Sequence, residues 1–491
     1  MEMFLKTREE YQKEVRAMRK NVWKDGRFID DIVTEPSCCR MIELNCYKYD
    51  MLNDPECQPL MTAKSEYGDY KVARWLTVKH SAEDCMMSSK MKRLIFDNVG
   101  TCAASSCTGW NAMQTVFAVA YDMDKEYGTK YYERINNWLK KVEKTACKVA
   151  GALTDAKGDR ALGGGQIGQQ ENPDCCVHKV GENADGIFVC GTKTMIAHAA
   201  SAHWLFIVPG YRYNDENKDY AVAFVCPRDA EGCYLVQTDI RSNDIKPESW
   251  DDMRFNDLCS YIIFENCFIP WEHVFMDGEA KYSSDFVTLF TANYRSEIGG
   301  CVAGQGDIMI GAAVLMNRAN GLPDKVIQDK ITDIMMINNM FYGIGLGALL
   351  DGWMHECGIW FANPNVGHSN KYWIGKYYAE QRRILQDIGG GIAETGCFPN
   401  YTDCTSEFMG PKIMKAIKAN PKVSAETRCR AARLCEWLEY GNGFLAFIHG
   451  GGSPDGAKMV VRGCYDLEYL AKKAAFIAGI DEVPEPVVKK K

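Results

Sequence analysis

The sequence predicts an α+β protein in which a β domain lies between two helical domains. Up to about residue 150, charged segments carry apolar residues at helical spacing. The next stretch changes to short β-branched and aromatic segments separated by turn signals, and helical spacing returns from about residue 281. We therefore expect an N-terminal helical domain at 1–150, a middle β domain at 151–280 and a C-terminal helical domain at 281–491.

The first region contains three segments with helical periodicity: Thr7–Arg19, Ser81–Asn98 and Asn111–Ala150. Thr7 and Glu10 have the spacing of a capping box, which predicts where the first helix begins. The N-terminus has no apolar signal core, so we expect no secretory signal. A segment of small residues, Thr101–Cys107, is expected to open the helix that begins near Trp110.

Five segments of the middle region have strand composition: Gly186–Cys190, His203–Val208, Tyr220–Cys226, Cys233–Thr238 and Ser260–Phe268. Pro270 is expected to close the last of them. Because no helical pattern separates these segments, they predict a small sandwich or barrel rather than alternating βαβ units.

The last region has five helical segments: Ser284–Gly321, Asp324–Trp353, Lys371–Gly389, Ser424–Tyr440 and Ser453–Ile480. Within the first, we expect Gly299-Gly300 to break the chain and present Cys301 to a close neighbour. The small residues that follow, from Gly304 to Ala313, should let this helix pack tightly. Taken alone, the segment is also compatible with an ordinary buried helix.

Composition limits the partners. The formal net charge is -8 and the only basic run is Lys489–Lys491, so nucleic acid is not an expected partner. The longest apolar run, Met340–Leu350, is too short to span a bilayer, and we expect a cytoplasmic protein without a membrane partner.

The chain has 22 cysteines and no Cys-x-x-Cys pair. With no secretory signal, the thiols should be reduced, most of them as small buried apolar residues. The absence of a Cys-x-x-Cys motif argues against zinc-ribbon and thioredoxin sites. So many oxidisable side chains would suit anaerobic metabolism.

Several motifs carry a family resemblance. They include Thr154-Asp-Ala-Lys-Gly-Asp-Arg160, the Gly299–Ala313 segment, Asp387-Ile-Gly-Gly-Gly391 and His449-Gly-Gly-Gly-Ser-Pro454. In this order they resemble the 4-hydroxyphenylacetate 3-hydroxylase/4-hydroxybutyryl-CoA dehydratase family, most closely its dehydratase branch, from about Arg74 to about Arg462. The resemblance implies an acyl-CoA dehydrogenase-like fold, FAD between the β domain and the C-terminal helices, and a homotetramer.

The resemblance also implies which residues meet FAD: Thr154, Asp155, Arg160, Lys193, Ile196, Ala197, Asp387, Gly389, Gly390, His449, Gly450 and Gly451. Gly-rich turns at helix starts offer N–H groups to a pyrophosphate, which gives this assignment a physical basis. The alternative is that these glycines only terminate helices.

A 4Fe–4S cluster held by three cysteines and one histidine is implied as well. Cys102, Cys107 and Cys301 stand at the cysteine positions, and Tyr294 replaces the histidine. Cys102 and Cys107 are one residue further apart than in the family. Residues five apart on a helix point about 140° apart, so both could reach one cluster only from a loop or a π-bulge. The alternative is three buried structural thiols.

The catalytic positions depart further. The family's histidine, tyrosine, lysine and two glutamates are replaced by Tyr294, Ile298, Val302, Cys259 and Ala446. These replacements predict an apolar pocket. Tyr294 and Glu297 are the candidates for acid–base work, the carboxyl with a raised pKa, and Arg295 could orient an anionic substrate group. A core tyrosine and a solvated helix glutamate are the alternatives.

The resemblance implies a flavin-dependent lyase or isomerase of the dehydratase type. FAD would take up a hydrogen or an electron and return it in a redox-neutral cycle, with the cluster as a Lewis acid. The substrate would be a small acid or its CoA thioester, other than 4-hydroxybutyryl-CoA. Two alternatives stay open: a flavin-dependent oxidoreductase without a cluster, either a dehydrogenase or a two-component hydroxylase, and a non-catalytic flavoprotein.

Overall fold

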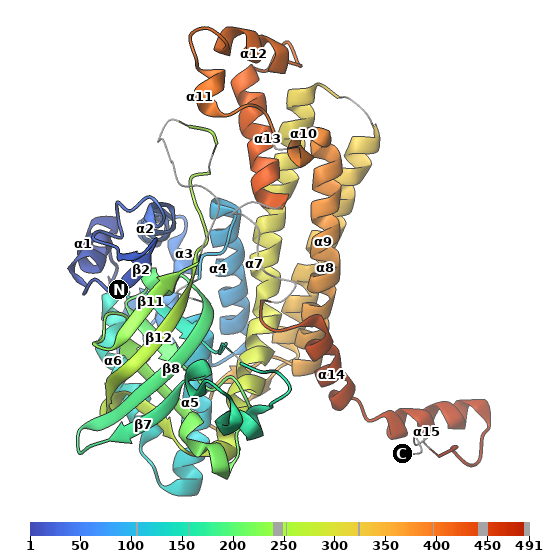
Figure 1. The fold of residues 1–491 in the computed structure, drawn as a ribbon. Helices are drawn as coiled ribbons and strands as arrows, with labels where there is room; N and C mark the ends of the chain where they lie inside the picture. Colours follow the sequence, from blue (N-terminus) through green and yellow to red (C-terminus); the bar gives the residue numbers. More distant parts are fainter. Residues whose placement is uncertain are drawn as a thin grey trace.

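A long central helix, a β domain and an outlying C-terminal arm make up the molecule (Figure 1). The computed structural model describes residues 1–104, 107–156, 158–238, 249–251, 253–322, 325–395, 397–439 and 450–485. The predicted order of helices, strands and helices is confirmed.

The N-terminal region consists mainly of helices: α1 (Arg8–Ala17), α2 (Cys39–Asn53), α3 (Gln58–Met61), α4 (Ala82–Val99), α5 (Thr108–Tyr127) and α6 (Tyr131–Val142). The predicted capping box is present: the Thr7 hydroxyl accepts from the Glu10 amide, and the Thr7 amide donates to the Glu10 carboxylate. A small sheet is added by β1 (Glu2–Met3), β4 (Thr62–Lys64) and β5 (Tyr70–Ala73). Helix α4 ends at Gly100 in the left-handed conformation, so Cys102 lies outside the helices that flank it.

Two sheets form the β domain. The six-stranded sheet has the order β3-β2-β11-β12-β8-β7, and the four-stranded sheet has the order β13-β10-β9-β6. Their strands are β2 (Val22–Lys24), β3 (Arg27–Phe28), β6 (Val149–Ala152), β7 (His178–Glu182), β8 (Gly186–Ala197), β9 (Trp204–Ile207), β10 (Val222–Pro227), β11 (Cys233–Gln237), β12 (Cys259–Pro270) and β13 (Val274–Asp277).

All five predicted strand segments are strands in the structure, as β8 to β12. The sequence did not indicate β6, β7 or β13, and it did not indicate that the N-terminal region supplies strands. Val22 in β2 pairs in parallel with Leu235 in β11, so residues 22–28 extend the larger sheet. The N-terminal region therefore shares a sheet with the β domain.

Helix α7 (Ser283–Asn320) is continuous through Gly299 and Gly300, so the expected break is wrong. Its glycines serve packing instead. A Cβ at Gly300 would overlap the Ser89 carbonyl oxygen of α4, and one at Gly299 would lie 2.6 Å from the Phe341 carbonyl oxygen of α8. Only a residue without a side chain lets these backbones approach so closely, and the predicted tight packing is confirmed.

The other C-terminal helices are α8 (Lys325–Leu350), α9 (Pro364–Gly389), α10 (Gly391–Glu394), α11 (Tyr401–Cys404), α12 (Gly410–Ile417), α13 (Ala425–Glu439), α14 (Pro454–Cys464) and α15 (Leu467–Ala478), with a hairpin of β14 (Trp353–Met354) and β15 (Trp360–Phe361). Helices α8 and α9 lie along α7, and α14 packs against α9, whereas α15 extends away from the body (Figure 1). We call residues 467–478 the C-terminal arm.

Two helices are long and apolar enough to cross a membrane by length and composition. In α7, 67% of the relevant window is buried within the protein, as expected for a core helix, and in α8 the value is 33%. Helix α8 therefore leaves one apolar face open, which includes Met336 and Leu350.

All 22 cysteines lie in the described part of the chain and none forms a disulfide. Cys464, at the end of α14, is the exposed one, and the others are buried or half-buried. This confirms the expectation of mostly buried thiols.

Candidate functional site

The three predicted cluster cysteines come together beside Tyr294. Cys102 and Cys107 lie in the connection between α4 and α5, and Cys301 lies on α7. Burial raises the pKa of the Cys102 thiol, and the Asp257 carboxylate and then the nearby thiols of Cys107 and Cys301 raise it further. The same three thiols raise the pKa of the Tyr294 phenol, again after burial as the larger cause. Because Cys102 lies outside α4 and α5, Cys102 and Cys107 do not share one regular helix, and the 140° separation expected there does not apply.

Lys48 of α2 fixes the connection that carries the first two cysteines. Its Nζ donates to the carbonyl oxygens of Ala103 at 2.7 Å and Ala104 at 3.2 Å. The side chain is fully buried, and burial lowers its pKa to about 8. Sequence analysis did not identify Lys48, because its contact crosses 55 residues and has no local signal.

Glu297 lies one helical turn before Cys301 and is completely buried. Its carboxylate forms ion pairs with Lys79, at 2.5 Å, and with Lys92, and it accepts from the Asn111 side chain at 3.0 Å. Burial alone would raise the pKa of Glu297, but the two lysines outweigh it and hold the pKa at about 2.

Two expectations are therefore corrected. A raised pKa for Glu297 is wrong, because two cations face the carboxylate, and a solvated helix position is also wrong. The predicted apolar character holds for Ile298 and Val302, which are buried. Charged side chains from α4 and from the segment before it, Lys92 and Lys79, nonetheless reach the same part of α7.

Tyr294 and Arg295 meet the turn that follows residue 449. The Tyr294 ring stacks on Phe290 with centroids 5.4 Å apart, and a Cβ at Gly451 would lie 2.6 Å from the ring. The Arg295 Nε donates to the Gly451 carbonyl oxygen at 2.9 Å. The structure thus joins two predicted catalytic residues to the predicted Gly450–Gly451 turn, whereas His449 and Ala446 lie outside the described residues.

The predicted flavin residues of the β domain form one neighbourhood. Asp155 and Lys193 pair as an isolated β-bridge, and their side chains form a buried ion pair of 2.6 Å. Thr154 and Arg160 are exposed beside them, while Ile196 is buried and Ala197 is half-buried. Lys193 also donates to two backbone carbonyls, so it holds the loop together.

Met195 gives this neighbourhood an unusual surface. It has a positive φ of 55° within β8, and 68% of its side chain is exposed. A non-glycine residue seldom adopts this conformation, and a large apolar side chain so exposed gains stability if a flat apolar group covers it. Met195 therefore offers an exposed apolar contact of the kind that suits a flat ring such as a flavin.

The Asp387–Gly390 turn lies elsewhere. Asp387 is exposed and pairs with Lys330 at 2.6 Å, at the far end of α9. Gly367, at the near end, crosses α7 at Ser296, and the 22 residues from there to Gly389 span about 33 Å of helix. Within a single chain, this turn therefore lies too far from Tyr294 to share a site with it.

The side chains near Tyr294 fit a cluster in part. Three thiols have the right chemistry, but the phenol at the fourth position has a raised pKa and is a weak ligand for iron. Among the described residues, no three His, Cys, Asp or Glu side chains lie close enough to hold a single metal ion. The thiols are thus neighbours without forming a compact mononuclear site.

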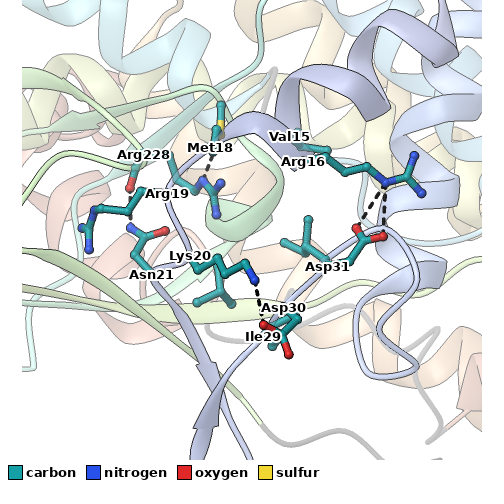
Figure 2. Close-up of a pocket in the computed structure, with 12 residues that line it drawn as sticks. Val15, Arg16, Met18, Arg19, Lys20, Asn21, Ile29, Asp30, Asp31 and Arg228 are labelled. Carbon is teal, nitrogen blue, oxygen red and sulfur yellow. Dashed lines mark hydrogen bonds and ion pairs between the residues drawn. The ribbon is translucent and has the colours of Figure 1, made fainter.

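A separate surface pocket lies between α1 and the β2 strand (Figure 2). Four of its charged side chains form two ion pairs, Arg16 with Asp31 at 3.2 Å and Lys20 with Asp30 at 2.7 Å. None of the predicted site residues lines it. This pocket is therefore not part of the candidate site.

Two family models match the chain. The model described as 4-hydroxyphenylacetate 3-hydroxylase N terminal matches residues 7–276, and the C-terminal model of the same name matches residues 283–479. Together they cover the helical, β and helical regions described above.

Two curated relatives illustrate the range of activities. A 4-hydroxybutyryl-CoA dehydratase/vinylacetyl-CoA-Delta-isomerase of Clostridium aminobutyricum is 28% identical over 97% of this chain and 100% of its own length. The oxygenase component of a 4-hydroxyphenylacetate 3-monooxygenase of Thermus thermophilus is 22% identical over 83% of this chain and 82% of its own length.

Solved structures show the same fold. An oxygen-tolerant archaeal 4-hydroxybutyryl-CoA dehydratase from N. maritimus has a TM-score of 0.93 at 28% identity, over 99% of this chain and 97% of that one. The oxygenase component HpaB, complexed with FAD and 4-hydroxyphenylacetate, has a TM-score of 0.82 at 19% identity, over 96% and 98%. At that identity the second likeness is one of fold alone.

Proposed function

Because the chain belongs to the 4-hydroxyphenylacetate 3-hydroxylase family, we propose that it is a flavin-dependent lyase or isomerase of the dehydratase type. Its substrate is a small organic acid or the CoA thioester of one. The observation that supports this most is the full-length similarity to a dehydratase, together with three thiols gathered at Tyr294.

The chain's own residues have distinct tasks in this proposal. The β-domain residues Thr154 to Arg160 and Lys193 to Ala197 hold FAD, which supplies transient uptake and return of a hydrogen or an electron. Cys102, Cys107 and Cys301 would hold a 4Fe–4S cluster, whose chemistry is that of a Lewis acid.

Proton transfer falls to Tyr294, which lies beside the cysteines with a phenol that stays protonated because burial raises its pKa. Glu297 has the opposite property, a carboxylate that stays charged between two lysines. We assign Glu297 to holding these lysines in place rather than to accepting a proton. The buried apolar side chains of Ile298 and Val302 favour a substrate other than 4-hydroxybutyryl-CoA.

The second candidate is a flavin-dependent oxidoreductase without a cluster. Several relatives are the oxygenase components of monooxygenases, which supports it. So does Tyr294, since a phenol is a poorer cluster ligand than the imidazole that the resemblance leads one to expect. A non-catalytic flavoprotein is the third candidate.

Purification without oxygen, followed by the visible spectrum and assays of iron and acid-labile sulfide, separates these candidates. For the dehydratase type we expect bound flavin and about four irons per chain. Flavin without iron would contradict the cluster and leave the oxidoreductase, and no flavin would contradict both.

A pair of variants sharpens this test. Cys102→Ser should lose most of the iron, because it removes one of three thiolate ligands. Cys226→Ser is the matched control, since Cys226 is a buried thiol in strand β10, whereas the three candidate ligands lie on α7 and between α4 and α5. Equal iron loss in both variants would mean that the effect is on folding, not on ligation.

We also propose a homotetramer. The open apolar face of α8 and the apolar C-terminal arm are the surfaces that support it, because exposed apolar areas of this kind mark contact sites.

A further inference from the structure

Arg295 is a buried cation without a carboxylate. Its side chain is 7% exposed, and no carboxylate of the described residues lies within ion-pair distance of its guanidinium. Its two printed contacts are the Gly451 carbonyl oxygen and the Nδ1 of His368, at 2.7 Å. A guanidinium has five N–H donors, so three of them have no partner among the residues that the structure describes.

The nearest acidic side chain on the same helix already has ion-pair partners. Glu297 follows two positions later, but it faces Lys79 and Lys92 and forms ion pairs with both. A buried charge without a counter-charge is costly, so an anion bound beside Arg295 would be stabilised by completing the pair.

Two more basic side chains lie beside Arg295 on α9. His368 is 1% exposed and Lys371 is fully buried. Lys371 follows His368 by three positions on α9, so the two side chains lie on the same side of the helix. Burial and the charge of Arg295 lower the pKa of His368 to about 3 and that of Lys371 to about 7. The pKa of Arg295 itself falls to about 10 on burial.

Helix packing holds these three basic side chains in place. Gly367 lets α9 cross α7 against the Ser296 side chain, and Asn370 donates to the Arg295 carbonyl oxygen at 3.3 Å. On the other side, a Cβ at Gly452 would lie 2.5 Å from the Arg295 Nη2, so only glycine allows the turn to come this close. The guanidinium therefore keeps one orientation next to Tyr294.

We propose that Arg295, His368 and Lys371 form a subsite for the carboxylate of the substrate. Arg295 makes the charge-assisted hydrogen bonds, for which its planar fork suits a carboxylate. His368 is the acceptor that orients the guanidinium, and Lys371 adds positive charge when it is protonated. The inference rests on the proposed function and narrows it: the substrate carries a free carboxylate in addition to the group that reacts.

Calorimetric titration with butyrate, and with butyramide as the uncharged isostere, tests the subsite on the protein as purified. We expect butyrate to bind and butyramide not to bind. Arg295→Met should weaken butyrate binding by roughly 10- to 100-fold, the effect of losing a hydrogen bond to a charged group. Lys371→Met, which keeps Arg295, should weaken it by a smaller factor.

Arg93→Met is the matched control. Arg93 also contacts α7, but it already has a carboxylate partner in Asp307 at 2.8 Å, so butyrate binding should not change. His368→Asn keeps an acceptor for Arg295 and should preserve binding, which separates orientation from folding. If Arg295→Met does not fold, Lys371→Met and the comparison of butyrate with butyramide still test whether the subsite binds a carboxylate.

Separate titration with FAD distinguishes the two possible sources of the anion. If Arg295→Met weakens binding of FAD but not of riboflavin, the three basic side chains bind a flavin phosphate, and the proposal is overturned. It is also overturned if butyrate does not bind or if no variant changes its affinity. Failure of the wild type to bind FAD would instead contradict the proposed function, because butyrate binding is measured independently.

Discussion

At Glu297, one carboxylate balances two lysines in the interior. Lys79 and Lys92 are both buried, and each forms an ion pair with a different oxygen of Glu297. Glu297 therefore joins α7 to α4 and to the segment that precedes α4. Removing it would leave two cations without a partner in the protein core.

Glu297→Gln should lower the free energy of unfolding by roughly 3–5 kcal/mol, the cost of breaking a buried ion pair from one side. Urea unfolding measures this. The matched control is Glu126→Gln, which removes a surface partner of Lys281 and should change the stability little, because water screens an exposed ion pair. A loss at Glu297 as small as that at Glu126 would contradict the assignment.

Glu297 also predicts how the free energy of unfolding falls at low pH. The pKa of Glu297 is about 2 in the folded protein, below its ordinary value of 4.5, so its contribution is present above that ordinary value and is lost as the pH falls toward 2. Wild-type stability should therefore decline from about pH 4.5 downward more steeply than that of Glu297→Gln. Identical slopes would mean that Glu297 titrates normally.

At the level of the helices, glycines on α7 determine how closely its neighbours pack. Gly300 and Gly311 lie on α7, three turns apart, and differ in their surroundings. A Cβ at Gly300 would overlap the Ser89 backbone, whereas one at Gly311 would have no atom within 4 Å.

Gly300→Ala should destabilise the protein by about 1–3 kcal/mol, because α4 and α7 must move apart to admit the methyl group. Gly311→Ala is the control on the same helix and should stabilise by up to about 1 kcal/mol, since alanine favours a helix over glycine. Thermal unfolding distinguishes the two. Equal shifts of the same sign would show that propensity, not packing, governs both sites.

The elements were predictable where a local pattern defines them. The capping box at Thr7 and five strands of the middle domain follow from neighbouring residues, and the motifs located Tyr294, Arg295 and the cysteines. The Gly299-Gly300 pair was misinterpreted, since a glycine pair looks the same whether it breaks a helix or admits a neighbour. Lys48, Lys79, Lys92 and His368 were missed because each acts across at least 55 residues.

At the scale of the whole molecule, the C-terminal arm stands apart from the body (Figure 1). Phe476 and Ile477 are 87% and 85% exposed. An arm of this kind gains stability when another copy covers it. This is the structural support for the proposed homotetramer.

Replacing Phe476 and Ile477 with serine should shift the protein toward smaller assemblies, as measured by light scattering after gel filtration. Phe408→Ser is the control, because Phe408 is 75% exposed but lies outside the arm. An unchanged tetramer in the double variant would place the contacts elsewhere, and a monomeric wild type would contradict the tetramer itself.

The distribution of thiols has a practical consequence. Burial raises the pKa of core cysteines, to about 11 for Cys38 and Cys147, so few of them are thiolate at neutral pH and they react slowly with electrophiles. Cys464 is the exposed exception and lies at the root of the arm. A maleimide dye added briefly to the native protein should therefore mark this position first, and its fluorescence would report docking of the arm without any engineered cysteine.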